Sequence, residues 1–432
     1  MNESLKFSRR QWLSRVGKTA VAGAALLSVP AYVRASAGNV VVIGGGFGGA
    51  TAAKYIKRRN PAIQVTLVEP AKTYYTCPFT NLYLGGLRTF EQQGHGFDEL
   101  RSLGVKVVHD FASGIDAEKR KVKLAGGDTL SYDKLLLSPG IDFRWNALEG
   151  YDEAASQLAP HAWKAGEQTV LLQKQLQAMP DGGKFIMVAP ANPFRCPPGP
   201  YERASMVAHY IKHNKPKSKL IILDAKDAFS KQGLFQQGWQ KFYSDIIEWV
   251  PLSKDGKVVR VDARNLSVET EFGEVHKADV LNVIPPQKAG AIADQAGVTD
   301  ESGWVPVKHQ TFESERVPGI YVVGDATLAA PMPKSGFSAN AQAKVAAAAI
   351  VSALAGKPPA QASFANTCYS LIAPDYGISV AHLYELRDGK LAEASGGVSP
   401  IGADTEFRKL EAEYGESWYN AIALDTWGTR SS

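Results

Sequence analysis

Hydrophobic positions along the chain fall into short apolar strands that alternate with segments of helical character. Two such units are visible, with strand, helix and strand at 40–43, 50–59 and 64–68 in the first and at 184–188, 201–212 and 220–224 in the second. Strands that alternate with helices are typical of a parallel sheet with helices on its faces. The pattern therefore predicts an α/β protein with two nucleotide-binding folds.

The turn inside the first unit has the composition of a dinucleotide site. Gly44, Gly46 and Gly49 form a Gly-x-Gly-x-x-Gly motif between strand and helix. Glycines there let the backbone turn tightly and approach a pyrophosphate at the helix N-terminus. Glu69 ends the next strand, about 20 residues later, where a carboxylate can bind a ribose hydroxyl. The combination favours a bound dinucleotide over a purely structural glycine turn.

The end of a later strand, together with Cys77, narrows this nucleotide to FAD. The apolar strand that ends at Gly324 and Asp325 is typical of FAD enzymes, in which the carboxylate accepts a hydrogen bond from a ribityl hydroxyl. A proline-rich turn then leads into a long Ala-rich helix, 338–354. In the FAD enzymes that this pattern resembles, the positive N-terminus of the corresponding helix faces the flavin. The residues of this turn expected to contact the cofactor are Lys334, Ser335 and Gly336. For Lys334, a solvated surface charge is an equal alternative.

The second nucleotide fold lacks a loop suited to NAD(P)H. Its first strand is followed by a proline-rich segment, 189–202. Proline has no N–H to offer a pyrophosphate and fixes φ, so this loop is not expected to form a phosphate site. It holds Cys196 rigidly instead, with Glu202 nearby in the sequence. A structural thiol in a stiff turn is the alternative.

The first 37 residues have the features of an export signal. Arg9 and Arg10 stand in a twin-arginine motif, a short apolar run follows at 21–29, and an Ala-Ser-Ala triplet at 35–37 is a signal-peptidase site. The run is about half as long as the ~20 residues of a membrane-spanning helix, which argues against the alternative of a membrane anchor. The mature protein is expected to be periplasmic and to be exported folded.

Removing residues 1–37 also removes the excess positive charge. They hold six of the 48 Lys and Arg residues and one of the 43 Asp and Glu residues, so the mature chain is close to neutral. This charge indicates no nucleic-acid partner and no attraction to an anionic membrane. No membrane-spanning segment is expected after residue 38, and no metal site is predicted.

Three cysteines are an odd number, which needs an explanation in an exported protein. Cys77 closely follows Glu69, where the chain of such a fold crosses toward the far end of the nucleotide; a buried inert thiol is the alternative. Cys196 and Cys368 lie far apart in the sequence and would have to converge on the flavin to form a disulfide. They are interpreted as a redox pair, with a structural cross-link to the tail as the alternative.

Four motifs around these residues resemble the flavoprotein subunit of flavocytochrome c sulfide dehydrogenase, a family related to sulfide:quinone oxidoreductases. They are 74–77 (YYTC), 194–202 (FRCPPGPYE), 331–336 (PMPKSG) and 366–370 (NTCYS). The resemblance implies two Rossmann-like dinucleotide-binding domains of the glutathione-reductase type and a C-terminal α+β interface domain. The expected parts are the signal peptide 1–37, an FAD-binding domain of 38–155 and 286–357, a second nucleotide fold without an NAD site, 156–285, and the interface domain, 358–432.

The resemblance also implies the chemistry. Cys77 would bind the flavin 8α-methyl group through a thioether, and Cys196 and Cys368 would form a redox-active disulfide that hydrosulfide attacks. Electrons would pass to FAD and then to haem in a separate cytochrome c subunit of a heterodimer, since this chain has no Cys-x-x-Cys-His haem site. Elemental sulfur or polysulfide would leave. Glu202 is the candidate for proton transfer beside Cys196, with a structural salt bridge as the alternative.

Two other functions are compatible with these residues. A sulfide:quinone oxidoreductase at the membrane would need an amphipathic tail, whereas residues 404–432 mix acids with scattered aromatics. An accessory flavoprotein that reduces thiols of a sulfur-oxidising complex would carry the same cysteines, and only activity separates the two. Two strands or hairpins are expected in the tail. There, Trp418 and Tyr419 either line the flavin or a partner interface or, as is more common, pack in the core.

Overall fold

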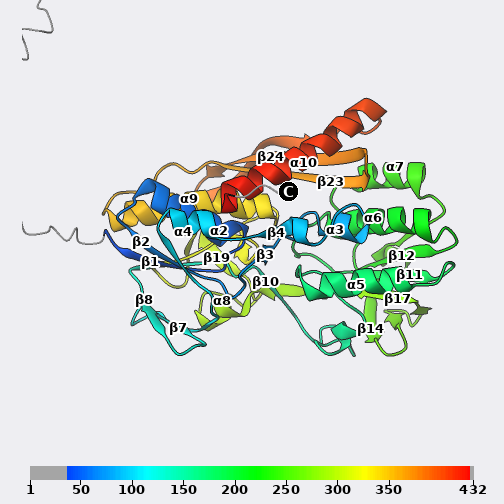
Figure 1. Ribbon diagram of the computed structural model, residues 1–432, viewed down its shortest axis with the longest axis horizontal. Coiled ribbons are helices and arrows are strands. Elements are labelled where there is room, and N and C mark those ends of the chain that lie inside the picture. The colour runs from blue at the N-terminus through cyan, green and yellow to red at the C-terminus, as the bar shows by residue number, and fades with distance from the viewer. Residues whose placement is uncertain (1–36, 429–432) are drawn as a thin grey trace, which may run out of the picture. The chain divides into compact units, whose positions relative to one another are not determined.

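The structure is a computed structural model and describes residues 37–428 of the 432-residue chain. The expected twin-arginine segment and most of its cleavage site therefore lie outside the described residues. Within 37–428, two larger sheets of mainly parallel strands and one antiparallel sheet form the framework (Figure 1). No helix in this range is long and apolar enough to cross a membrane. The same residues contain no cluster of three or more His, Cys, Asp or Glu side chains that could hold a metal ion.

The first large sheet has eight strands and carries the glycine-rich turn. Its strands, in spatial order, are β22 (Thr327–Leu328), β19 (Val305–Lys308), β20 (Glu313–Ser314), β21 (Ile320–Val322), β9 (Lys134–Leu137), β1 (Asn39–Ile43), β2 (Gln64–Val68) and β5 (Val105–Val108). The neighbours from β21 to β5 are parallel. Strand β1 is buried along almost its whole length, as expected of a parallel strand covered on both faces. Helices α2 (Phe47–Arg59) and α9 (Gly336–Leu354) pack against each other beside this sheet.

The second large sheet contains four parallel strands: β13 (Ile247–Val250), β12 (Lys219–Asp224), β11 (Lys184–Ala189) and β17 (Val280–Val283). Three helices accompany it: α5 (Glu167–Ala178), α6 (Gly199–Asn214) and α7 (Gln232–Phe242). The α/β class and both nucleotide-type units are confirmed. Helices α2, α6 and α9 each begin two or three residues before the start predicted from the sequence, because glycines and a proline at these starts extend the first turn.

Smaller elements surround the two sheets. The short helices are α3 (Thr80–Leu84), α4 (Asp98–Ser102) and α8 (Ala291–Gln295). The small antiparallel sheets are β3 (Tyr74–Tyr75) with β4 (Gly94–His95), β6 (Ala112–Asp116) with β7 (Lys121–Leu124) and β8 (Thr129–Ser131), β10 (Ile141–Phe143) with β18 (Gln287–Ala289), and β14 (Val258–Asp262) with β15 (Ser267–Thr270) and β16 (Val275–Lys277).

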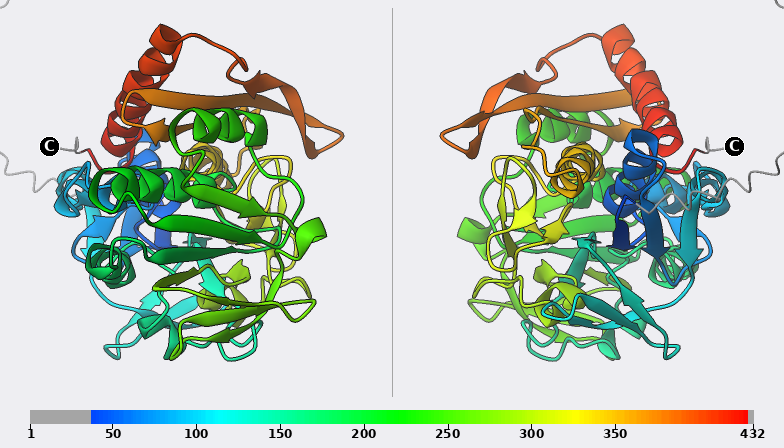
Figure 2. Two further views of the ribbon diagram at one scale, coloured as in Figure 1. Left: turned by 90° about the vertical axis from the view of Figure 1, so that its right-hand side faces the viewer. Right: turned by 90° about the vertical axis from the view of Figure 1, so that its left-hand side faces the viewer.

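The tail forms a third layer. It consists of the antiparallel strands β23 (Phe364–Ala373), β24 (Tyr376–Arg387) and β25 (Lys390–Val398), followed by the 23-residue helix α10 (Thr405–Trp427). Strand β23 packs on α9 of the first unit and on α6 and α7 of the second, and Figure 2 shows the tail, coloured orange to red, beside these helices. Because β23 touches helices of both units, it brings the third cysteine to the place where the two units meet.

Candidate active site

The glycine-rich turn and Glu69 are in direct contact. Gly44 has a φ of 98°, in the left-handed region, and a Cβ at Gly44 or Gly49 would overlap backbone atoms. Glu69 accepts hydrogen bonds from the N–H of Gly45 at 2.7 Å and from that of Ala71 at 2.9 Å. This end of the site is a cavity of about 510 Å³, whose wall includes Gly44, Gly45, Gly46, Glu69 and Pro70. The carboxylate holds the turn in place here, and its contact with a ribose remains a prediction.

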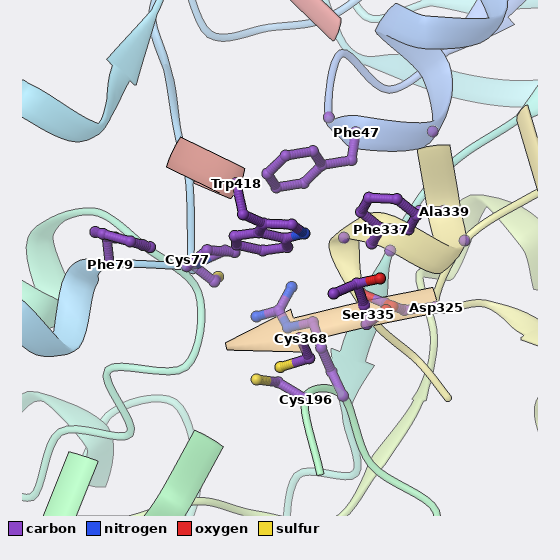
Figure 3. Close-up of a pocket in the computed structure, with 18 of the residues that line it drawn as sticks. Phe47, Cys77, Phe79, Cys196, Asp325, Ser335, Phe337, Ala339, Cys368 and Trp418 are labelled. Atoms are coloured by element: carbon purple, nitrogen blue, oxygen red, sulfur yellow. The ribbon is translucent and has the colours of Figure 1, made fainter. Parts of the chain in front are cut away.

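A second cavity, of about 100 Å³, lies next to the first and joins distant segments of the chain (Figure 3). Its wall includes Gly46, Cys77, Cys196, Gly324, Asp325, Gly336 and Cys368. One carboxylate oxygen of Asp325, Oδ1, is buried and has no hydrogen-bond partner among the described residues. Burial raises the pKa of Asp325, while Arg195 and Lys334 lower it. A buried acceptor without a partner is what a ribityl hydroxyl requires, so the residues present fit FAD.

Lys334 is not a solvated surface charge. Its Nζ donates to the carbonyls of Asp325 at 2.8 Å and Thr327 at 2.7 Å, and it lies 3.7 Å from the centroid of the Trp304 ring. Burial lowers the pKa of Lys334 to about 8, against the effect of Asp325. The ammonium therefore stabilises the turn that presents Asp325, and direct contact of Lys334 with the cofactor remains a prediction.

Ser335 and Gly336 begin helix α9 at the edge of the cavity. The Ser335 hydroxyl caps the helix by accepting from the N–H of Ser338 at 3.1 Å, and it donates to Asn366 Oδ1 at 2.6 Å. A Cβ at Gly336 would stand 2.9 Å from the Phe47 ring. This position thus needs glycine for close packing, and the cap joins the helix to the tail strand that carries Cys368.

All three cysteines lie in the described part of the chain, and each is a free thiol that borders the flavin cavity. Cys196 has a φ of 57°, and its N–H donates to the Lys334 carbonyl at 2.7 Å. Cys368 lies in β23 opposite Val380. Figure 3 shows the side chains of Cys196 and Cys368 pointing toward one another. The structure therefore brings together the two cysteines that the sequence separates by most of the second unit and α9.

Glu202 stands in the first turn of α6 and borders the same cavity. Burial raises the pKa of its carboxyl to about 7, although Lys231, the Ser370 hydroxyl and the Leu371 N–H lower it. The Lys231 ammonium is itself buried and donates to Ser370 Oγ at 2.8 Å. Sequence reasoning missed both partners. Ser370 stood in the Cys368 motif as a signal, whereas nothing local distinguished Lys231 from a surface lysine.

The C-terminal aromatics divide between the cavity and the core. Trp418 borders the cavity, and its Nε1 is buried without a hydrogen-bond partner in residues 37–428. Tyr419 is fully buried, and its hydroxyl lies 2.8 Å from Thr76 Oγ1 and 3.0 Å from His95 Nε2. The structure thus places Trp418 at the wall of this cavity and Tyr419 in the core; contact of Trp418 with the flavin remains a prediction. Both residues lie on α10, a helix that the sequence did not predict, because two strands or hairpins were expected in the tail.

Three family models match this chain. Residues 169–285 match the central part, and residues 360–427 the flavin-binding part, of the flavoprotein chain of flavocytochrome c sulfide dehydrogenase. Residues 38–176 match the pyridine nucleotide-disulphide oxidoreductase model. These segments contain the glycine-rich turn and all three cysteines.

Individual relatives point the same way. The chain is 62% identical over 43 residues, 10% of its own length and 90% of the other sequence, to a sulfide dehydrogenase [flavocytochrome c] flavoprotein chain of Chlorobaculum thiosulfatiphilum. It is 25% identical over 324 residues, 71% of its length and 69% of the relative, to the mitochondrial sulfide:quinone oxidoreductase of Mus musculus. The solved sulfide:quinone oxidoreductase of Aquifex aeolicus has a TM-score of 0.73 at 18% identity, covering 90% of this chain and 92% of that one. A putidaredoxin reductase in complex with putidaredoxin has a TM-score of 0.62 at 17% identity, covering 87% and 93%, respectively.

Proposed function

We propose that this chain, which belongs to the family of flavocytochrome c sulfide dehydrogenase flavoprotein chains, passes electrons from sulfide through a disulfide and FAD to a cytochrome c partner. The family makes it a sulfide-oxidising flavoprotein oxidoreductase that uses FAD. The disulfide step, the thioether and the acceptor are the proposed parts. The observation that carries the disulfide step is the meeting of Cys196 and Cys368 in one cavity with the unpartnered oxygen of Asp325.

The paired cysteines support a disulfide step. When hydrosulfide attacks a disulfide between Cys196 and Cys368, a new S–S bond forms to one cysteine as the old bond breaks. The products are a persulfide on that cysteine and a thiolate on the other, which keeps the electron pair. Bound FAD supplies a two-electron acceptor that can release electrons singly. A second hydrosulfide can then take the outer, zero-valent sulfur of the persulfide and leave with it as polysulfide. This leaves both cysteines as thiolates, which hold the two electrons that bound FAD would accept as the disulfide forms again.

Glu202 is suited to accept the proton that the persulfide releases. A carboxyl whose pKa is about 7 can take a proton from an incoming or newly attached S–H group near neutral pH and return it later. Lys231 lowers the pKa of both Glu202 and Cys368. Its ammonium therefore favours the charged forms of the base and of the released thiolate.

Cys77 is suited to hold FAD covalently. Its thiol borders the flavin cavity, and it is only half-buried. Its Sγ lies 3.5 Å from the Trp163 carbonyl. A thioether to the flavin 8α-methyl group would also explain why a third cysteine stands beside a redox pair.

The proposed acceptor is haem in a separate cytochrome c subunit. The support is the 62% identical relative, whose name includes a flavocytochrome c, together with the two family models of that chain. This chain has no Cys-x-x-Cys-His motif, so the haem would belong to the partner. Export to the periplasm by the twin-arginine route is part of the same proposal and is supported by Arg9 and Arg10.

A quinone is the second candidate acceptor, and one observation favours it. On α10, Phe407, Leu410 and Tyr414 recur at helical spacing, and their side chains are 40–54% exposed. Ile401, just before the helix, is 68% exposed. The scattered apolar residues of the tail therefore gather into a stripe. The sulfide:quinone oxidoreductase relatives have the same fold.

Purified mature protein separates the two acceptors. Sulfide oxidation is measured with cytochrome c and, in parallel, with a soluble short-chain quinone. Faster turnover with cytochrome c is expected. Turnover with quinone but not with cytochrome c would show that quinone is the electron acceptor. The proposed oxidation of sulfide by the disulfide and FAD would still hold.

A further inference from the structure

A small cavity adjoins the flavin cavity on the side of Cys196. Its volume is about 20 Å³, where a single water needs about 10–15 Å³. Cys196, Cys77 and Arg195 border both cavities, whereas Cys368 borders the flavin cavity and not the small one. The small cavity therefore has room for one molecule of about the size of water, and that molecule would meet only one sulfur of the redox pair.

Several residues that border this small cavity are positively charged or hydrogen-bond donors, which favours an anion. Trp163 is 5% exposed, and its Nε1, which can only donate, has no hydrogen-bond partner in the described part of the chain. Arg203 is 2% exposed, with its guanidinium carbon 4.9 Å from the Trp163 ring, and Arg195 donates to the Trp163 carbonyl. No Asp or Glu of residues 37–428 borders the cavity. A buried arginine, a half-buried arginine and a tryptophan with an unused donor thus border a space without a carboxylate.

Arg203 is held rigidly in this position. Its Nη1 donates to the His161 carbonyl and to Asn282 Oδ1, each at 3.0 Å, and its Nε donates to Asn81 Oδ1 at 3.3 Å. Burial lowers the pKa of Arg203 to about 10, so the guanidinium remains charged near neutral pH. A fixed positive charge in a buried wall attracts an anion more strongly than one in water does.

We infer that this cavity binds hydrosulfide and delivers it to Cys196, which makes Cys196 the sulfur attacked. The inference rests on the proposed function. Hydrosulfide is a small anion with a nucleophilic sulfur, and organic thiols are too large for the space. The step balances: the S–S bond from hydrosulfide to Cys196 forms, the Cys196–Cys368 bond breaks, and Cys368 leaves as a thiolate with the electron pair.

The surroundings of the two sulfurs agree with this direction. Attack on a disulfide requires the nucleophile to approach away from the leaving sulfur, and the small cavity meets Cys196 without meeting Cys368. Burial raises the pKa of both thiols, and that of Cys196 is raised well above its ordinary value. For Cys368, Lys231 lowers the pKa, against the effects of burial and of Glu202. The sulfur whose thiol is more acidic leaves faster, so Cys368 is the better leaving group and Cys196 the site of attack.

Narrowing the small cavity tests its role in binding. A Cβ at Gly199 would stand 2.7 Å from the Trp163 ring and 3.0 Å from Cys196 Sγ, so Gly199→Ala presses on two residues of the cavity wall and narrows the approach to Cys196. The matched control is Gly397→Ala, because a Cβ there meets nothing within 4 Å. In oxidised holoprotein, Gly199→Ala is expected to raise the KM for sulfide by about tenfold or more, roughly the effect of 1.4 kcal/mol in binding. The flavin spectrum and reduction by dithionite should not change.

A second variant keeps the test independent of packing. Trp163→Phe removes the unpartnered N–H and keeps an aromatic ring, with Trp145→Phe as a control outside the cavity. We expect a higher KM for sulfide with a kcat close to that of the wild type, whereas a purely structural role would lower flavin content and thermal stability instead. An unchanged KM in both Gly199→Ala and Trp163→Phe would overturn the inference.

Mapping the first persulfide tests the direction of attack. Oxidised holoprotein receives one equivalent of sulfide without oxygen, is alkylated at once and is analysed by peptide mass spectrometry. The extra sulfur atom is expected on the peptide of Cys196. If it lies on Cys368 while sulfide still bleaches the flavin, the inference fails and the proposed function stands. If sulfide does not bleach the flavin of the wild type, both fail.

Discussion

The indole Nε1 of Trp427 donates a hydrogen bond to the carbonyl of Gly45 at 3.0 Å, across 382 positions of sequence. This bond joins the last turn of α10 to the glycine-rich turn. The Trp427 ring also packs on Tyr74, with centroids 5.3 Å apart, and on Phe47 at 4.9 Å. The end of the tail thus supports the part of the first unit that would hold the cofactor's pyrophosphate.

Trp427→Phe is therefore expected to weaken FAD binding. The change removes one buried hydrogen bond, worth about 0.5–1.5 kcal/mol, and leaves the Gly45 carbonyl unpaired. FAD retention is measured in a Cys77→Ala background, so that a covalent bond does not mask the effect. Trp239→Phe is the matched control, because it loses a similar bond to Ser205 at 2.9 Å far from the glycine-rich turn. Equal FAD retention in the two variants would argue against a role for Trp427 in cofactor binding.

Cys77→Ala is expected to release the flavin. If Cys77 forms a thioether, the yellow colour of the wild type stays with the protein after acid precipitation and passes into the supernatant in the variant. Cys368→Ser serves as the control, because it should keep the flavin attached. Wild-type protein that loses its colour in acid would contradict the thioether.

Cys368→Ser is expected to abolish the bleaching of the flavin by sulfide, because a serine oxygen cannot form the disulfide that hydrosulfide attacks. Stopped-flow absorbance of the flavin measures the rate. Reduction by dithionite, which does not need the disulfide, should proceed as in the wild type. Bleaching at the wild-type rate would exclude a redox role for Cys368.

Glu202→Gln is expected to remove the part of the pH dependence of flavin bleaching that comes from ionisation of this carboxyl group. The pKa of Glu202 is about 7, so the carboxylate that accepts a proton is present above this pH and absent below it. The ratio of wild-type to variant bleaching rates should rise as the pH increases through about 7. Taking the ratio cancels the ionisation of sulfide itself. Glu301→Gln, at an exposed position, is the control and should give a ratio that does not vary with pH.

The same carboxyl has a consequence for stability. Its pKa is raised from the ordinary value of 4.5 to about 7, so the folded state favours its protonated form. The contribution to stability is fully present below about 4.5 and is lost as the pH rises through about 7. Denaturant unfolding across this interval should show a smaller decline for Glu202→Gln than for the wild type. Parallel curves would mean that the carboxyl titrates normally.

The sequence by itself determined those parts of the protein whose chemistry is local. The glycines at 44, 46 and 49, the strand before them and Glu69 after them lie within one strand–helix–strand unit, where apolar periodicity and glycine conformation leave few alternatives. The proline-rich segment around Cys196 excluded a second phosphate loop for an equally local reason, since proline offers no N–H. The class of fold and the cysteines worth testing followed from such stretches.

Only the tertiary structure decided the surroundings of those cysteines. Lysine and arginine are residue types usually found at the surface, so nothing in the sequence marks Lys231 or Arg203 as buried. Lys231 becomes buried where it meets Ser370 of β23, and Arg203 where α6 meets α3 and β17. The cavity beside Cys196 is bordered by Trp163, Gly199 and Asn81, which come from separate segments of the chain. Contacts of this kind, like that of Trp427 with Gly45, depend on how distant elements pack against one another, and no periodicity within a single element encodes them.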